Sequence, residues 1–149
     1  MRFIELRLED APEDNQYDAV IGSGVLHHVE IAPALQKIFQ ILKPGGYMAF
    51  TEPNMLNPVV FTMMQIPFIR RRYRYVSPDE SAFYRWQLQN LMKKIGYVEI
   101  HVTPFDWLYP STPTGLIPLV EKLGRLCERL PGVREISGSF FIHGRRPVS

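Results

Sequence analysis

Two adjacent histidines follow a glycine-rich turn in the segment IGSGVLHHVE, which spans residues 21–30. An imidazole titrates near neutral pH, so His27 or His28 could take a proton from a hydroxyl or amine group during a reaction. Either ring could equally form the wall of a pocket or the entry to a helix. Two neighbouring histidines without a cysteine partner are thin evidence for zinc, and no metal site is expected.

A second pair of polar residues stands in the segment TEPN, at positions 51–54. Glu52 and Asn54 could orient a small molecule that approaches the histidines. Their side chains could equally hold the loop 51–57 in place by bonding to its backbone. Both interpretations stay open at the level of the sequence.

Alternating strands and helices must position these residues. Apolar residues alternate with other side chains over 2–8, as in a half-buried strand, and a short apolar strand ends at 23. Helical spacing of apolar residues predicts a helix over 30–42, which KPGG (43–46) ends before a strand at 47–54.

The second half of the chain repeats this alternation. Ser77, Pro78 and Glu80 form a capping signature that predicts a helix from 77 to 95. A strand follows at 97–105, then a helix at 116–130 whose leucines are expected to pack into the core, and a last strand at 136–146. The segment 55–76, rich in Met, Pro and Arg, is expected to be irregular.

Helices that regularly separate strands predict an α/β fold, with a mainly parallel sheet covered by helices on both faces. Ligands of such sheets lie at the carboxyl ends of the strands. The segments 22–28 and 51–54 should therefore meet at one edge of the sheet, where the histidines would stand close to the chemistry.

Composition limits the class of protein. The 149 residues suffice for one domain, and 17 basic against 15 acidic residues make nucleic acid an unlikely partner. Cys127 is the one cysteine, the first ten residues lack the apolar core of a signal peptide, and the apolar run 58–69 is too short to span a bilayer. A cytoplasmic protein is expected.

Several segments together resemble the class I S-adenosylmethionine-dependent methyltransferases. Tyr17-Asp18 matches the aromatic-Asp pattern that opens the fourth strand of that family, and LKPGG (42–46) matches the turn before the fifth. Gly96-Tyr97 matches the step to the sixth strand, and SGSFFIHGRR (137–146) the antiparallel seventh. The resemblance covers residues 1 to 146.

The resemblance implies a Rossmann-like fold and methyl transfer from S-adenosylmethionine to a small, amphiphilic molecule. Asp10 and Ala11 would hold the adenine, and Ser23 and Gly24 would lie beside the amino-acid portion of the cofactor. The acceptor would face His27 and His28 as catalytic residues, with Glu52 and Asn54 as binding residues.

The chain departs from the family pattern at its amino end, because the glycine-rich motif that follows the family's first strand is absent. Residues 1–149 look like a single partial domain, truncated at the amino end, with 55–76 as an insertion or lid. The cofactor site would be incomplete and this chain inactive alone. An uncovered central strand predicts self-association, or an upstream polypeptide that completes the sheet.

Two other functions remain open. The chain could be a non-enzymatic interaction domain that has lost cofactor binding, or a nucleotide-binding Rossmann domain that uses Gly22-Ser23-Gly24, with Glu52 as the ribose acid. The run IRRRYRY (69–75) is compatible with peripheral membrane contact or with a solvated face beside a lid, and the role of Arg70–Arg74 stays open.

Overall fold

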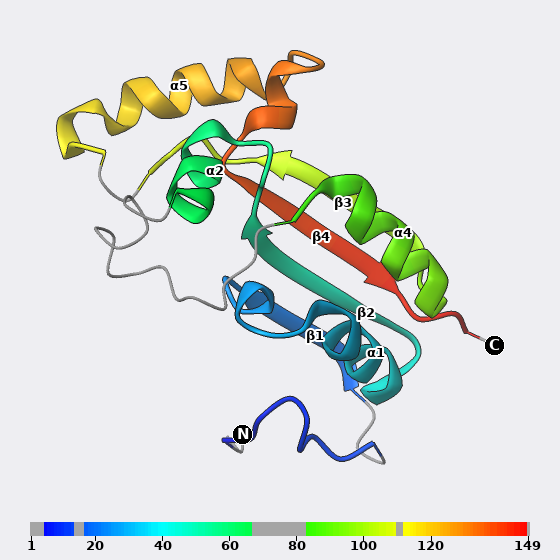
Figure 1. The fold of residues 1–149 in the computed structure, drawn as a ribbon. Coiled ribbons are helices and arrows are strands. Elements are labelled where there is room, and N and C mark those ends of the chain that lie inside the picture. Colours follow the sequence, from blue (N-terminus) through cyan, green and yellow to red (C-terminus); the bar gives the residue numbers. More distant parts are fainter. Residues whose placement is uncertain (1–4, 14–16, 67–82, 110–111, 149) are drawn as a thin grey trace.

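The computed structural model describes residues 5–13, 17–66, 83–109 and 112–148, which fold around a four-stranded sheet (Figure 1). The predicted α/β class is confirmed. The strands are β1 (Tyr17–Ser23), β2 (Leu42–Pro53), β3 (Val98–Phe105) and β4 (Ser139–Arg145). The α-helices are α1 (Ile31–Ile41), α2 (Pro58–Gln65), α4 (Arg85–Ile95) and α5 (Ile117–Cys127). Short 3-10 helices are η1 (Leu26–His28), η2 (Thr114–Leu116) and η3 (Val133–Ile136).

The strands lie in the order β1-β2-β4-β3. β1 and β2 are parallel, whereas β4 runs antiparallel to both β2 and β3. β1, β2 and β3 therefore share one direction, and the predicted antiparallel last strand is confirmed. Because β4 lies between β2 and β3, only β1 and β2 pair in parallel, and the described sheet is mixed where a mainly parallel one was predicted. Because Ser23 pairs with Thr51, the carboxyl ends of β1 and β2 meet at one edge of the sheet.

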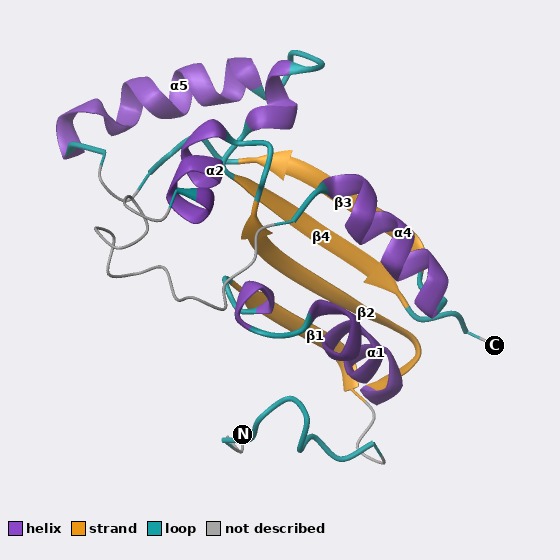
Figure 2. Ribbon diagram, in the orientation of Figure 1, coloured by secondary structure: helices purple, strands orange, loops and turns teal. Residues whose placement is uncertain are grey.

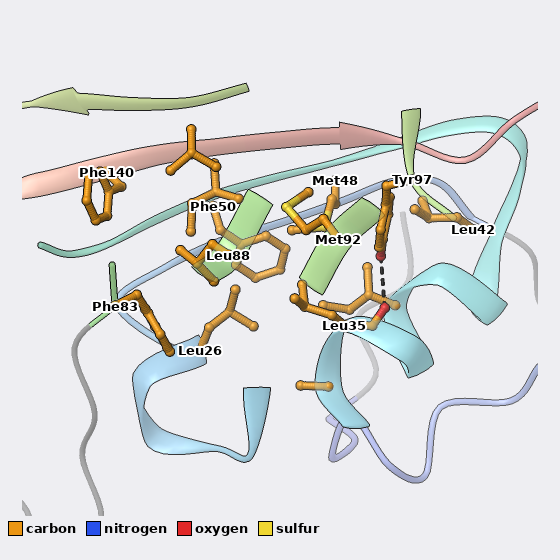
Figure 3. Close-up of a cluster of buried hydrophobic side chains, with 14 residues drawn as sticks. Leu26, Leu35, Leu42, Met48, Phe50, Phe83, Leu88, Met92, Tyr97 and Phe140 are labelled. Atoms are coloured by element: carbon orange, nitrogen blue, oxygen red, sulfur yellow. Dashed lines mark hydrogen bonds between the residues drawn. The ribbon is translucent and has the colours of Figure 1, made fainter. Parts of the chain in front are cut away.

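The hydrophobic core lies between one face of the sheet and helices α1 and α4 (Figures 2 and 3). Successive residues of a strand point to opposite faces, and in β2 Met48 is buried while Tyr47 is exposed. In α1, Leu35 and Ile38 lie one turn apart and are both fully buried, as the helical spacing predicts. The same core includes Phe50, Leu88, Met92, Val102, Phe140 and Ile142.

The opposite face of the sheet differs from the prediction of helices on both faces. Ile21 of β1 is 75% exposed, and Tyr47 and Phe141 are also exposed. Both α1 and α4 pack on the other face (Figure 2). Within the described residues, helices cover one face only, so apolar side chains of three neighbouring strands meet solvent.

Other boundaries also differ from the sequence pattern. Residues 5–8 form no strand, because the backbone turns at 7–11, where the N–H groups of Asp10 and Ala11 donate to the carbonyls of Arg7 and Leu8. The segment expected to be irregular contains α2, which Asn57 caps. The capping signature at 77–80 and the arginines 70–74 lie outside the described residues, and α4 begins at Arg85.

The expectation that the leucines of 116–130 pack into the core is wrong. They are exposed, and Gly124 is the buried residue of α5. Periodicity identifies the apolar side of a helix, but not whether another element covers that side. As for membrane spans, no helix in the described part of the chain is long and apolar enough to cross a bilayer.

Tyr97 joins the sheet to α1. Its hydroxyl donates a hydrogen bond of 2.9 Å to the carbonyl of Leu35, drawn as a dashed line in Figure 3. Its ring meets Phe39 edge to face, with 5.0 Å between the ring centroids. Burial raises the pKa of Tyr97 far above the ordinary value, because the fold disfavours the charged phenolate.

We expect Tyr97→Phe to lower the free energy of unfolding by about 1 kcal/mol at neutral pH, because the hydrogen bond is lost. A raised pKa means that the fold favours the neutral phenol. The stabilisation by the neutral phenol is complete below about pH 10, the ordinary pKa of tyrosine. It is lost as the pH rises toward the pKa of Tyr97 in the folded protein. Tyr97→Phe should therefore lose less stability above pH ~10 than the wild type. Denaturant unfolding at neutral pH and above pH ~10 measures the free energy of unfolding of both proteins. The exposed Tyr47→Phe is the control.

Candidate active site

The edge where β1 and β2 end carries the predicted site. Gly24 follows β1 with φ of 62°, a left-handed conformation that glycine adopts without strain. Its N–H donates to the carbonyl of Thr51 at 2.8 Å, so the chain leaves the sheet beside β2. The chain then enters η1, which contains both histidines. The predicted meeting of the two segments is therefore observed.

Glu52 holds this turn from the neighbouring strand. Its buried carboxylate accepts the N–H groups of Val25 at 3.0 Å, Leu26 at 2.8 Å and His27 at 3.2 Å. Successive backbone N–H groups that converge in this way form a binding site for an anion. The carboxylate of Glu52 is thus the anion that orders the segment before α1.

The same carboxylate holds the side chain of His27. Nδ1 of His27 lies 2.8 Å from Oε2 of Glu52, and the two side chains are 12% and 0% exposed. A carboxylate can only accept, so Nδ1 carries the shared hydrogen. In the neutral ring Nε2 then keeps its lone pair, which is the arrangement a general base requires.

His28 is placed differently from His27. It is exposed, and its ring is tilted by 38° against that of His27, with 4.0 Å between the centroids. A cavity of about 480 Å³ opens beside the end of the sheet, and His27 lines it whereas His28 does not. Of the two predicted catalytic residues, His27 therefore has the position of a base.

The cavity has a polar end and an apolar wall. Ser23 and Gly24 line it beside His27, and α2 and the segment 106–109 form its other side. Tyr109 donates a hydrogen bond of 2.6 Å to Oδ1 of Asn57, and burial raises the pKa of this tyrosine. The apolar wall consists of Pro53, Val60, Met63, Met64 and Leu108.

The contacts of Asn54 agree with the interpretation in which its side chain holds the loop 51–57 in place. Its amide nitrogen donates to the carbonyls of Glu135 and Ser137, both at 2.8 Å, and its oxygen accepts the N–H of Leu56. It is fully buried. Its amide thus joins the end of β2 to the segment before β4, and its role toward an acceptor stays a prediction.

Sequence reasoning missed Asn57, Asp106 and Tyr109. Asn57 had a usable signal, because an Asn directly before a Pro is typical of a helix N-terminus. Its side chain accepts the N–H groups of Val59 and Val60. Tyr109 reaches Asn57 from 52 positions away, and local pattern cannot show such a contact.

The predicted cofactor residues are divided between two cavities. Ser23 and Gly24 line the one beside His27. Ala11 lines a second cavity of about 590 Å³ along the outer edge of β1, with Tyr17 and Ile21. The N–H of Ala11, predicted to face the adenine, donates to the carbonyl of Leu8 at 3.2 Å. Asp10 is exposed and is not among the described residues that line either cavity.

The alternative of a Gly22-Ser23-Gly24 nucleotide motif finds less support in the geometry. A Cβ at Gly22 would lie 2.5 Å from the ring of Phe50, so this glycine permits core packing. The carboxylate of Glu52, proposed as the ribose acid, is occupied by the turn at 25–27. As for metals, the described residues contain no group of three or more His, Cys, Asp and Glu that could hold an ion.

We expect the neutral ring of His27 to carry its hydrogen on Nδ1, and Glu52→Gln to mix the two tautomers. The amide of Gln also turns donors toward the turn, which should lower the free energy of unfolding by about 1–3 kcal/mol. Long-range ¹H–¹⁵N correlation of the histidine rings at a pH where imidazole is neutral measures the tautomer. The exposed Glu30→Gln is the matched control, and an unchanged His27 signal in Glu52→Gln would contradict the assignment.

The first third of the sequence matches a methyltransferase family model and one curated protein. Residues 1–50 match the family model "Methyltransferase domain". Over 50 residues the chain is 42% identical to a probable polyketide synthase of Dictyostelium discoideum. This match covers 33% of this chain and 2% of that protein.

Solved structures match over most of the chain. A S-adenosylmethionine-dependent methyltransferase from Thermotoga maritima has a TM-score of 0.65 at 17% identity, covering 96% of this chain and 62% of that one. The N-methyltransferase NodS of Bradyrhizobium japonicum, solved with S-adenosyl-L-homocysteine, has a TM-score of 0.52 at 12% identity, with coverages of 95% and 52%. The CurJ carbon methyltransferase has a TM-score of 0.54 at 16% identity, and the match covers 95% of this chain and 34% of that one.

The chain thus spans less than two thirds of the length of the relatives it matches. The order β1-β2-β4-β3 with an antiparallel β4 agrees with the fourth, fifth, seventh and sixth strands that the sequence indicated. Residues 1–50 thus match a methyltransferase domain, and the chain shares the fold of solved S-adenosylmethionine-dependent methyltransferases, so sequence and fold both support the predicted resemblance to that family.

Proposed function

We propose that this chain provides the acceptor side of an S-adenosylmethionine-dependent methyltransferase, whose acceptor must lose a proton before or during methylation. The observation that carries this proposal is the pair of His27 and Glu52 at the mouth of the 480 Å³ cavity. An acceptor that is already nucleophilic needs no base. A partly buried histidine held by a buried carboxylate supports an acceptor with an acidic C–H or O–H bond.

His27 would accept the acceptor's proton at Nε2, because Nδ1 is engaged with Glu52. The C–H or O–H bond of the acceptor breaks, and its electron pair becomes the nucleophile. The ring becomes an imidazolium, and the negative carboxylate of Glu52 stabilises that charge at 2.8 Å. Glu52 acts here as a positioning residue, in place of the direct acceptor contact that the sequence suggested.

The matches differ in their acceptors, because NodS is an N-methyltransferase and the Thermotoga maritima protein a possible histamine N-methyltransferase. We propose a carbon acid for this chain, because the pair of His27 and Glu52 suits an acceptor that must lose a proton, and two matches agree with it. The CurJ protein is a carbon methyltransferase, and the sequence relative is a probable polyketide synthase. We take a β-ketoacyl thioester as the carbon acid to test. The carbon between two carbonyl groups of such a thioester is acidic enough for a histidine to deprotonate. Val60, Met63 and Met64 would contact the acyl chain, which fits an acceptor with an apolar part.

The described residues fit the cofactor in part. Bound S-adenosylmethionine would supply an electrophilic methyl group on its sulfonium. Ser23 and Gly24 are small residues beside His27, so the amino-acid portion could approach the backbone there. The 590 Å³ cavity has the size of a small-molecule site and an apolar wall, but the described residues that line it include no carboxylate for the ribose hydroxyls.

The outer edge of β1 supports a completing partner. No strand of the described residues pairs with that edge, and Ile21 beside it is exposed. Unpaired N–H and C=O groups on a strand bind another strand readily. We propose that a second copy or an upstream polypeptide covers this edge and completes the cofactor site, so that the chain alone is inactive.

Calorimetric titration with S-adenosylhomocysteine tests the cofactor half of the proposal. We expect binding that strengthens with protein concentration, because association completes the site. Asp10→Ala should abolish binding if this carboxylate holds the adenine amino group, and the neighbouring exposed Glu9→Ala should not. A folded protein that shows no binding, and that sedimentation shows to be monomeric, would support the interaction-domain alternative.

Transfer of a methyl group to the acetoacetyl thioester of N-acetylcysteamine tests the acceptor half, under conditions where S-adenosylhomocysteine binds. We expect His27→Gln to lower kcat by about 10²–10⁴-fold, the usual contribution of a general base. The affinity for S-adenosylhomocysteine should stay unchanged.

His28→Gln is the matched comparison, because it changes the adjacent histidine that does not line the cavity. Its kcat should fall far less. Equal losses in the two variants, or wild-type activity in His27→Gln, would contradict the role of His27. Product formed from an alkylphenol but not from the thioester would point to an oxygen acceptor.

A further inference from the structure

Helix α5 and the residues at its two ends expose a continuous row of leucines. Leu116, Leu119, Leu123, Leu126 and Leu130 recur at intervals of three and four residues, and each is between 46% and 56% exposed. Residues spaced in this way lie on one side of a helix. We call them the leucine stripe. Figure 1 shows α5 beyond the end of the sheet, apart from α1 and α4.

The other side of α5 is fixed to the protein. A Cβ at Gly124 would lie 3.2 Å from the side chain of Trp107, so the helix approaches that indole closely. Oε1 of Glu128 accepts the N–H of Asp106 at 3.2 Å. These contacts set the rotation of the helix about its axis. The leucine stripe therefore faces away from the protein as a consequence of packing.

Charge is distributed unevenly around α5. At 100° per residue, Lys122, Arg125 and Arg129 follow one border of the leucine stripe, and all three are exposed. We call them the basic flank. Glu121 and Glu128 lie farther round, and the carboxylate of Glu121 lies 3.8 Å from the guanidinium of Arg125. Lys122 and Arg129 give this border of the stripe its positive charge.

We propose that the leucine stripe and the basic flank of α5 bind the surface of an anionic lipid bilayer, with the helix lying in the plane of the interface. Leucines on one face and Lys or Arg beside them are the combination by which interfacial helices bind membranes. Each basic residue near an anionic surface adds to the attraction, and the leucines enter the boundary between headgroups and acyl chains.

A second copy of the chain fits this surface less well. A leucine seam that joins two helices is typically sustained over three or four heptads, whereas this stripe spans about two. A coiled coil also carries charged residues on both borders of its seam. Here one border is basic and the other packs against the segment that contains Trp107.

The segment 106–109 links helix α5 to the acceptor cavity. Trp107 packs under α5, while its neighbours Leu108 and Tyr109 line the 480 Å³ cavity. The carbonyl of Asp106 accepts the N–H of Gly138, which also lines that cavity. A bilayer bound at α5 would therefore lie one short segment away from the cavity, where an amphiphilic acceptor could enter.

Co-sedimentation of the full 149-residue chain with vesicles tests the proposal without any methyl transfer. We expect binding to vesicles of phosphatidylcholine mixed with phosphatidylglycerol, and much weaker binding to phosphatidylcholine alone. Leu119→Ser with Leu123→Ser should lower the partition coefficient about tenfold or more, because apolar burial is lost. Lys122→Gln and Arg129→Gln should each lower it about fivefold on anionic vesicles only.

Val148→Ser is the matched control, because Val148 is an exposed apolar residue far from α5 in the sequence. Circular dichroism confirms that each variant is folded. Equal binding by all variants, or no binding of the wild type to anionic vesicles, would overturn the proposal. A wild-type dimer that the leucine substitutions dissociate, without vesicle binding, would instead assign the stripe to a second copy.

Discussion

The carboxylate of Glu52 is the contact on which the candidate site depends. It is fully buried, and burying an anion is costly unless hydrogen bonds replace its hydration. Three consecutive backbone N–H groups and Nδ1 of His27 supply those bonds. The same bonds fix the turn after β1, the start of η1 and the orientation of the imidazole. One side chain on β2 thus determines the geometry of a loop that lies about 25 positions earlier in the chain.

The second constraint is that the helices of the described residues cover one face of the sheet. Leu35, Met92 and their neighbours bury that face completely. The other face and the outer edge of β1 present Ile21, Tyr47 and Phe141 to solvent. Apolar surface and unpaired backbone in the middle of a Rossmann-like fold favour association, since both are stabilised by covering. The proposed completion of the cofactor site follows from this constraint.

Much of the fold could be predicted from local pattern. The helix at 30–42 and the strands at 47–54 and 97–105 were recognised from the spacing of their apolar residues, and each lies within a few residues of its predicted bounds. Within the predicted strand 2–8, the described residues 5–8 form no strand, since a strand forms only where another strand pairs with it. The site was predictable in location, because parallel strands bring their carboxyl ends together.

The roles inside the site were less predictable, because they depend on contacts between distant positions. Glu52 appeared as an acceptor ligand, yet its oxygens are taken by residues 25–27. Tyr109 became part of the site through Asn57, 52 positions away. The spacing of the α5 leucines was correct, but only the packing of Trp107 against Gly124 shows which side faces outward.

The segment 106–109 connects α5 to the acceptor cavity, because it contacts the helix on one side and lines the cavity on the other. Asp106 adopts φ of 72°, which is uncommon for a residue other than glycine, and its N–H and carbonyl are held by Glu128 and Gly138. These bonds fix the direction in which Trp107, Leu108 and Tyr109 point. A methyl acceptor with an apolar chain partitions into bilayers, so a cavity near a membrane-bound helix would receive it at high local concentration. Under the two proposals, the exposed leucines of α5 and the apolar wall of the cavity would serve the same amphiphilic acceptor.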